Sequence, residues 1–325
     1  MQHTTLRVLS VVAGLIASLA ANGVSAQAFP TKPIVLVNPY GAGGPADLIA
    51  RALAKDLATE LGQSVVVENK PGAGASIGAG FVARAEPDGY TLLLGTAAAH
   101  IVTPLIQKVP YDGIQDFAFV ALAPTQPNLL VVHPDVKATN VKELIALAKA
   151  SPGKLNYGSS GAGTSPHLGG ELLKLTAKID LVHIPYGGAA PALTDLVAGR
   201  LQAAVMNLSG ELPYVKAGKL RALAYASTKR SPLLPDVPTF AEVGLGGAES
   251  SSWYTVAAPK GTPAAIVDRI NKAIATVYQH PEFRKLMDAQ GAEVTAMSPE
   301  ETTRFVKDDA KRTVDLIKSA NLKLE

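Results

Sequence analysis

The stretch IVLVNPYGAGGPADLIARALAKDLATEL, residues 34–61, contains three successive elements. Its first four residues form an apolar run rich in β-branched side chains, which predicts a short strand. A glycine-rich loop follows, and residues 46–61 then place apolar side chains at helical spacing up to Gly62. A strand that leads through such a loop into a helix is typical of α/β proteins.

The same alternation continues along the chain. Further strands are predicted at 65–67, 90–94, 120–123, 129–132, 155–157, 182–184 and 202–206, and helices at 141–150, 168–177 and 192–197. Amphipathic surface helices are expected at 264–278 and 300–317. This order predicts an α/β fold with mainly parallel sheets covered by helices. The 325 residues are too many for one small core and indicate two domains or one large α/β unit.

Composition excludes several classes of function. Charged residues make up only 18% of the chain and the net charge is +3, which argues against a nucleic-acid-binding protein because phosphate contacts need clustered Lys and Arg. The six histidines are scattered without metal-ligand spacing, so neither a metal site nor a cofactor is predicted. The chain has no cysteine and therefore no disulfide.

Residues 1–26 have the pattern of a secretory signal peptide. Arg7 supplies a positive charge, residues 8–21 are apolar, and small residues at 24–26 precede Gln27. The apolar stretch is short for a membrane span, although an uncleaved anchor is the alternative interpretation. We therefore expect an exported, periplasmic protein.

Three loops rich in small residues each lead into a helix that opens with proline. The loops are residues 40–44, 158–164 and 186–189, and the prolines are Pro45, Pro166 and Pro191. Small residues allow a ligand to approach the backbone, and free N–H groups at a helix start attract anions. If two of these loops face one cleft, they suit a carboxylate. No Lys or Arg occurs in 40–47 or 158–167, so backbone N–H groups and hydroxyls would have to hold the anion.

Each of these features also has a purely structural interpretation. Glycine-rich loops often only form turns, Asp47 suits the start of a helix, and Ser165 suits an N-cap. His167 is either an anion donor or an ordinary surface or packed histidine, and Trp253 either packs at a hinge or contacts ligand.

Two patterns in the sequence suggest an enzyme. The first loop fits a loose G-x-G-x-x-A dinucleotide pattern, and Glu68 stands where an acid holds a ribose. An exported protein meets no soluble nicotinamide pool, however, and the second loop has no role in such a site. The nucleophile elbow G-x-S-x-G is not satisfied around Ser159 and Ser160. An atypical exported serine hydrolase that uses His167 or His183 remains the alternative.

Motifs in order along the mature chain resemble the Bug family, the periplasmic solute receptors of tripartite tricarboxylate transporters. The matching stretches are 29–34 (FPTKPI), 40–51 (YGAGGPADLIAR), 67–78 (VENKPGAGASIG), 87–92 (PDGYTL), 111–117 (YDGIQDF), 155–173 (LNYGSSGAGTSPHLGGELL), 183–186 (HIPY), 190–196 (APALTDL), 217–223 (AGKLRAL), 235–239 (PDVPT), Trp253 and 258–263 (APKGTP).

The resemblance implies a two-domain periplasmic-binding-protein fold of the type II-like, Venus flytrap kind, with a hinge and a ligand cleft between domains. Its expected boundaries are 27–126 with 252–325 for domain 1 and 127–251 for domain 2, with hinge crossings near 124–129 and 250–253. The residues indicated by the loops and the resemblance together are Tyr40, Ala42, Gly43, Gly44, Ala46, Asp47, Thr96, Ala97, Ser159, Ser160, Gly163, Thr164, Ser165, His167, Tyr186 and Asn207. Family members often carry an acid near position 207, where this chain reads Val205-Met206-Asn207, so the resemblance does not fix the ligand.

The sequence thus predicts a non-enzymatic periplasmic binding protein. Its ligand would be a small organic carboxylate, captured for uptake or sensing. The resemblance implies integral membrane permease subunits as partners, and we expect a monomer that binds no nucleic acid. The alternative is an exported hydrolase-like α/β enzyme acting on a small carboxylate or ester.

Overall fold

The computed structural model describes residues 29–319. The predicted signal peptide, residues 1–26, lies outside this range. No helix among the described residues is long and apolar enough to cross a membrane.

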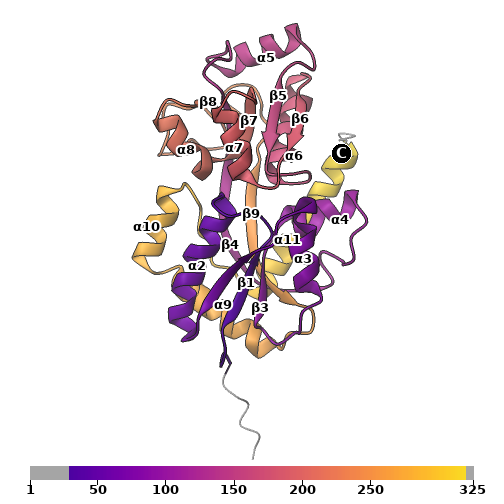
Figure 1. The fold of residues 1–325 in the computed structure, drawn as a ribbon, viewed down its shortest axis with the longest axis vertical. Coiled ribbons are helices and arrows are strands. Elements are labelled where there is room, and N and C mark those ends of the chain that lie inside the picture. Colours follow the sequence, from indigo (N-terminus) through magenta and orange to yellow (C-terminus); the bar gives the residue numbers. More distant parts are fainter. Residues whose placement is uncertain (1–28, 320–325) are drawn as a thin grey trace, which may run out of the picture.

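The molecule consists of two halves stacked along its long axis and connected by two long strands, β4 (Phe117–Val132) and β9 (Ser251–Pro259) (Figure 1). The lower half contains β1 (Ile34–Asn38), α2 (Pro45–Leu61), β2 (Val65–Asn69), η1 (Ala73–Ala75), α3 (Ser76–Ala83), β3 (Thr91–Thr96), η2 (Ala98–Val102), α4 (Thr103–Ile106), α9 (Ala264–Val277), α10 (Pro281–Ala289) and α11 (Pro299–Ser319). The upper half contains α5 (Val141–Ala150), β5 (Asn156–Ser159), α6 (Ser165–Ala177), β6 (Val182–Pro185), α7 (Ala189–Val197), β7 (Ala203–Asn207), α8 (Leu208–Lys216) and β8 (Arg221–Ala226).

The strands form one continuous path, β2-β1-β3-β9-β4-β7-β5-β6, and β8 also pairs with β4. β1 pairs in parallel with β2 and β3, and β5 does so with β6 and β7. All pairings of β4 and β9 are antiparallel. The expectation of mainly parallel sheets is therefore wrong for the centre of the molecule, because the chain crosses to the upper half along β4 and returns along β9 in the opposite direction.

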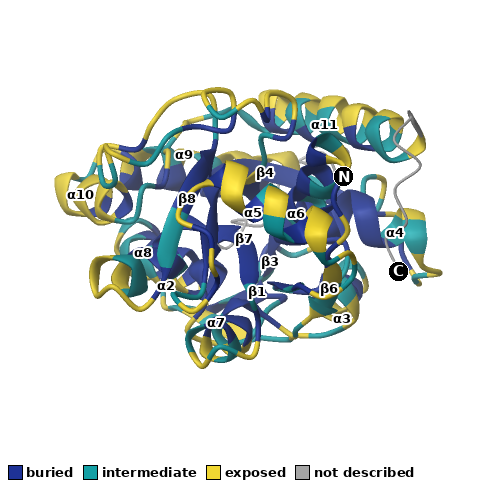
Figure 2. Ribbon diagram, turned by 90° about the horizontal axis from the view of Figure 1, so that it is seen from above, coloured by how far each residue is buried: buried dark blue, intermediate teal, exposed yellow. Residues whose placement is uncertain are grey.

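The central strands of both halves are buried on two faces, which explains their nearly continuous apolar runs, whereas the edge strands β2 and β6 are partly exposed. In β3, Leu92 and Leu94 pack with α2 and α9, whereas Leu93 packs with α3 and η2 on the other face. In β4, Leu130 packs towards α5 and α6, and Leu129 towards α7 and α8. Figure 2 shows the resulting dark-blue centre inside helices with exposed outer faces. Each buried Leu contributes about 1.5–3 kcal/mol to folding.

Two predicted strands, 120–123 and 129–132, are parts of the single strand β4. Pro124 and Pro127 lie between the two predicted strands, and proline cannot donate a ladder hydrogen bond. The structure accommodates Pro124 with a shift in register between Ala123 and Gln126. At this irregularity, Thr125 exchanges two backbone hydrogen bonds with Glu293, in the segment after α10.

The carboxyl group of Glu211 is an unusual feature of α8. The side chain is completely buried, and neither carboxyl oxygen has a hydrogen-bond partner among the described residues. Burial raises the pKa of Glu211 well above its ordinary value of 4.5. The folded protein therefore holds this group protonated at pH values where the unfolded chain has released the proton.

Replacing Glu211 with Gln is expected to stabilise the protein increasingly as the pH rises. The favourable contribution of the buried neutral acid is fully present below pH 4.5 and is lost as the pH rises through the higher folded-state pKa. Between pH 4.5 and the folded-state pKa, the free energy of unfolding of the wild type falls by about 1.4 kcal/mol per pH unit relative to that of Glu211→Gln. Urea unfolding between pH 4 and pH 8 measures this difference. Glu300→Gln, at an exposed position in α11, is the control, and parallel pH profiles for wild type and Glu211→Gln would contradict the assignment.

Candidate ligand-binding cleft

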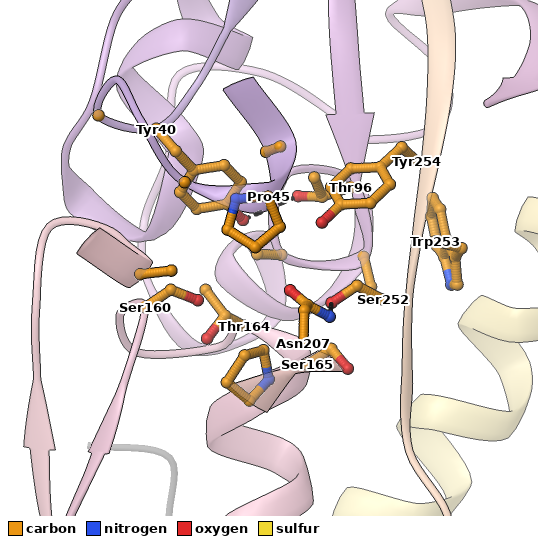
Figure 3. Close-up of a pocket in the computed structure, with 17 residues that line it drawn as sticks. Tyr40, Pro45, Thr96, Ser160, Thr164, Ser165, Asn207, Ser252, Trp253 and Tyr254 are labelled. Atoms are coloured by element: carbon orange, nitrogen blue, oxygen red, sulfur yellow. Dashed lines mark hydrogen bonds between the residues drawn. The ribbon is translucent and has the colours of Figure 1, made fainter. Parts of the chain in front are cut away.

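A cleft lies between the two halves, at the carboxyl ends of β1 and β3 (Figure 3). It is lined by Tyr40, Gly41, Gly44, Pro45, Ala46, Thr96, Ala97, Ala98, Ser160, Thr164, Ser165, Pro166, Ala189, Asn207, Ser252, Trp253 and Tyr254. About 470 Å³ between its walls is free of atoms, including a part open to solvent.

The cleft collects the amino-terminal ends of four helices. Pro45 begins α2, Ser165 begins α6, Ala189 begins α7, and Asn207 is the N-cap of α8. All four residues line the cleft. Each helix start carries a partial positive charge and unsatisfied N–H groups, so the four ends together favour an anion. None of the described lining residues is Lys, Arg, His, Asp or Glu.

The loop of the lower wall is held in place by Asp47, which does not itself line the cleft. Its carboxylate accepts hydrogen bonds from the Gly43 N–H at 3.0 Å, from Arg51 Nε at 2.9 Å and from Asn69 Nδ2 at 2.9 Å. Asn69 Nδ2 also donates to the Tyr40 carbonyl at 3.0 Å. Burial raises the pKa of Asp47, but the hydrogen bonds from Arg51, Gly43 and Asn69 outweigh burial and keep the pKa below 3.8. Asp47 is thus an ionised loop anchor.

Tyr40 extends from this loop to the end of β3. Its hydroxyl lies 3.2 Å from Thr96 Oγ1, which also accepts a hydrogen bond from the Ala99 N–H. Burial raises the pKa of Tyr40 to about 12, and the Thr96 contact lowers it only in part. The phenol therefore stays neutral at pH 7 and offers the cleft a hydroxyl rather than a charge.

The loop of the upper wall rests on two histidines, of which His167 is buried and His183 is half-buried. The rings of His167 and His183 stack with centroids 3.9 Å apart. His167 Nδ1 accepts a hydrogen bond from the Gly163 N–H at 3.0 Å, and His183 Nε2 lies 2.6 Å from Ser159 Oγ. Burial lowers the pKa of His167 to about 4 and that of His183 to about 3, so both are neutral at pH 7. The pair supports the loop from behind and adds no positive charge to the cleft.

An amide network closes the inner end of the cleft. Asn207 Nδ2 donates to Asn128 Oδ1 and to Ser252 Oγ, each at 2.9 Å. Asn128 Nδ2 donates in turn to Ser165 Oγ at 3.0 Å and to Ser250 Oγ at 2.9 Å. Asn128 and Asn207 are direct partners in the β4–β7 pairing, and Ser252 lies on β9. The network therefore ties three strands to the start of α6.

The structure brings nine of the sixteen predicted residues to the cleft surface, namely Tyr40, Gly44, Ala46, Thr96, Ala97, Ser160, Thr164, Ser165 and Asn207. The other seven, Ala42, Gly43, Asp47, Ser159, Gly163, His167 and Tyr186, do not line it. Ser159 is fully buried, and the Tyr186 hydroxyl donates to Asp195 at 2.7 Å. Thr164 is the N-cap of α6, although Ser165 was expected there.

Ser252 and Tyr254 line the cleft but are not among the residues predicted from the sequence. Both lie on β9, which pairs with β4 across a long sequence separation, and no local pattern reveals that pairing. Trp253 has the packing role that was one of its two interpretations, because its Nε1 donates to Asp309 on α11 at 2.8 Å. The same residue also lines the cleft. Among residues 29–319, no group of three or more His, Cys, Asp or Glu is placed to hold a metal ion.

Comparison with known proteins agrees with this architecture. Residues 49–322 match the family described as "Tripartite tricarboxylate transporter family receptor". Protein BugT of Bordetella pertussis is 36% identical over 322 residues, which cover 98% of this chain and 99% of BugT. The structure of the periplasmic binding protein BugD superposes with a TM-score of 0.85 at 35% identity, covering 91% of this chain and 99% of BugD.

Two further structures carry a named small molecule. R. palustris Rpa4515 with adipate has a TM-score of 0.87 at 37% identity, and covers 90% of this chain and 98% of that one. MatC (Rpa3494) from Rhodopseudomonas palustris with bound malate has a TM-score of 0.85 at 31% identity, and covers 89% of this chain and 100% of that one. The shared two-half architecture is that of the periplasmic binding proteins, with one α/β domain on each side of the cleft. The chain is a member of the Bug-type receptor family of tripartite tricarboxylate transporters.

Proposed function

We propose that this protein is a periplasmic receptor that captures a small organic carboxylate between its two domains. The observation that carries the proposal is the convergence of four helix amino termini on one cleft that has no basic side chain in its described lining. An anion buried there is stabilised by N–H groups and hydroxyls. The adipate and malate in two related structures support a carboxylate as the ligand class.

The proposed domains are residues 27–126 with 252–325, and residues 127–251. Within the described part of the chain, β4 and β9 are the only strands that run between the two domains. Bending of these strands near 124–129 and 250–253 therefore opens the cleft. Ligand binding to both walls then shifts the population towards the closed form. We further propose that residues 1–26 direct export and that the protein is a monomer. Its role would be uptake or sensing of the ligand. The family description suggests a membrane permease as its partner.

One contact favours a hydrolase as the second candidate. Ser159 Oγ and His183 Nε2 are 2.6 Å apart, a distance suited to an activated serine. Ser159 is nevertheless fully buried and does not line the cleft, so a substrate in the cleft does not reach its hydroxyl. Recovery of any bound acid or ester unchanged after long incubation favours the receptor, and turnover favours the hydrolase.

A thermal-shift screen tests the carboxylate proposal. Residues 27–325, unfolded and refolded to remove bound ligand, are screened against mono-, di- and tricarboxylates, aromatic acids and uncharged solutes. A ligand at 100 times its Kd adds about 2.7 kcal/mol of stability, which raises the Tm by about 4 °C for a protein of this size. Shifts restricted to uncharged solutes would overturn the proposal.

A pair of matched variants locates the site. Ser160→Phe places a large side chain in the cleft lining and is expected to abolish the thermal shift. Ser64→Phe is the control, because Ser64 is exposed just before β2, at the end of the sheet opposite the cleft. An undiminished shift in Ser160→Phe would place the ligand elsewhere.

The anchoring role of Asp47 gives a further prediction. Asp47→Asn removes the charge from three hydrogen bonds and is expected to lower the free energy of unfolding by about 1–3 kcal/mol and to weaken carboxylate binding. Asp56→Asn on the same helix is the control, since the Asp56 side chain makes no hydrogen bond or ion pair with any described residue. Its effect should stay within about 0.5 kcal/mol. Calorimetric titration and urea unfolding measure both quantities, and wild-type values for Asp47→Asn would show that the loop does not need this anchor.

A further inference from the structure

The side chain of Asn207 has one group that the fold leaves unused. Asn207 is the N-cap residue of α8, a position where the side-chain oxygen normally accepts a backbone N–H of the first turn. Here the side chain makes no such cap. No described residue donates a hydrogen bond to Asn207 Oδ1, and in Figure 3 this oxygen points into the cleft.

The orientation of the Asn207 amide is determined by its neighbours. Its Nδ2 lies 2.9 Å from Asn128 Oδ1, 2.9 Å from Ser252 Oγ and 3.4 Å from the carbonyl oxygen of Gln126. A carbonyl oxygen only accepts hydrogen bonds, so turning the amide over would set two oxygens against each other. The nitrogen therefore faces the strands, and the oxygen faces the cleft.

The hydroxyl groups of Ser165 and Ser252, beside Asn207, can donate a hydrogen bond to a ligand, whereas Asn207 Oδ1 can only accept one. Ser165 Oγ accepts from Asn128 Nδ2, and Ser252 Oγ accepts from Asn207 Nδ2. Ser165 is thus left with a hydroxyl hydrogen to donate, as a carboxylate requires, and Ser252 can turn its hydrogen either to the Tyr254 hydroxyl or to a ligand. Asn207 Oδ1 is an acceptor among these donors. Asn207 is only 6% exposed, so a plain carboxylate that fills the cleft removes the remaining water from this acceptor and leaves it without a partner.

We propose that Asn207 selects carboxylates that also carry a hydroxyl group, which donates a hydrogen bond to Asn207 Oδ1. The inference rests on the proposed carboxylate function. An ammonium group would satisfy the same acceptor, but no Asp or Glu is among the described lining residues to balance its charge. The nearby carboxylate of Asp47 is already bound to Arg51 and does not line the cleft. A neutral hydroxyl therefore fits better than an ammonium.

Calorimetric titration of the full mature chain with matched acids tests this selection. The probes are straight-chain mono- and dicarboxylates of three to six carbons, each compared with its 2-hydroxy, 3-hydroxy and 2-amino derivatives. We expect at least one hydroxy acid to bind about tenfold to about a hundredfold more tightly than the unsubstituted acid of the same length, the range that corresponds to leaving one buried polar group unpaired.

Two variants assign the preference to Asn207. Asn207→Leu removes the acceptor at similar size and should bring the ratio of the two Kd values close to one. Ser252→Ala removes a donor beside it, so both acids should weaken by a similar factor while the ratio is kept. The ratio in the wild-type protein tests the selection even if Asn207→Leu fails to fold.

The outcomes separate the two proposals. Equal or tighter binding of the unsubstituted acids, tighter binding of the amino acids, or an unchanged ratio in Asn207→Leu overturns the role of Asn207 and leaves the carboxylate receptor intact. If none of these probes binds and no acid in the thermal-shift screen raises the Tm, the proposed carboxylate function itself is wrong.

Discussion

The antiparallel pairing of β4 with β9 is the constraint on which the rest of the structure depends. β4 packs in the cores of both halves and β9 in the core of the lower half, and the two strands carry the chain from one half to the other and back. Their pairing at Gln126 and Ser252 brings the inner end of the cleft next to the crossing. The amide network of Asn128 and Asn207 is built on this pairing, so the position of the upper wall follows from the register of a few central residues.

The cleft is suited to an anion without carrying an opposite charge. An ionised side chain buried opposite a ligand carries its own desolvation cost, and that cost can exceed the attraction gained. Helix starts and hydroxyls are fixed dipoles that need no counterion, and their orientation is set when the protein folds. The ionised or titratable groups nearby, Asp47, His167 and His183, act from behind the loops and hold them in position.

Structure that depends on neighbouring residues could be predicted from the sequence. The strand, loop and helix around residues 34–61 appear as predicted, and so does the helix Val141–Ala150. The pairing of strands that are far apart in the sequence could not be predicted. No local pattern in the sequence indicates that β9 lies between β3 and β4, so Ser252 and Tyr254 are absent from the predicted lining. For the same reason the sequence predicts two strands, 120–123 and 129–132, where the structure has the single strand β4 with an irregularity near Pro124. The loop residues Gly43, Asp47 and Gly163 were grouped with the lining because sequence proximity does not distinguish a residue that touches a cleft from one that supports it.

The lack of charged side chains in the described lining also affects how the protein responds to its surroundings. Dissolved salt screens interactions between exposed charges beyond about 8–10 Å, whereas short hydrogen bonds inside a closed cleft are screened much less. Affinity for an anion should therefore vary little with ionic strength. The same lining adds no formal charge to the field that a distant ligand meets, so it contributes little to electrostatic steering. Selectivity is then expressed mainly in how long the closed cleft retains its ligand.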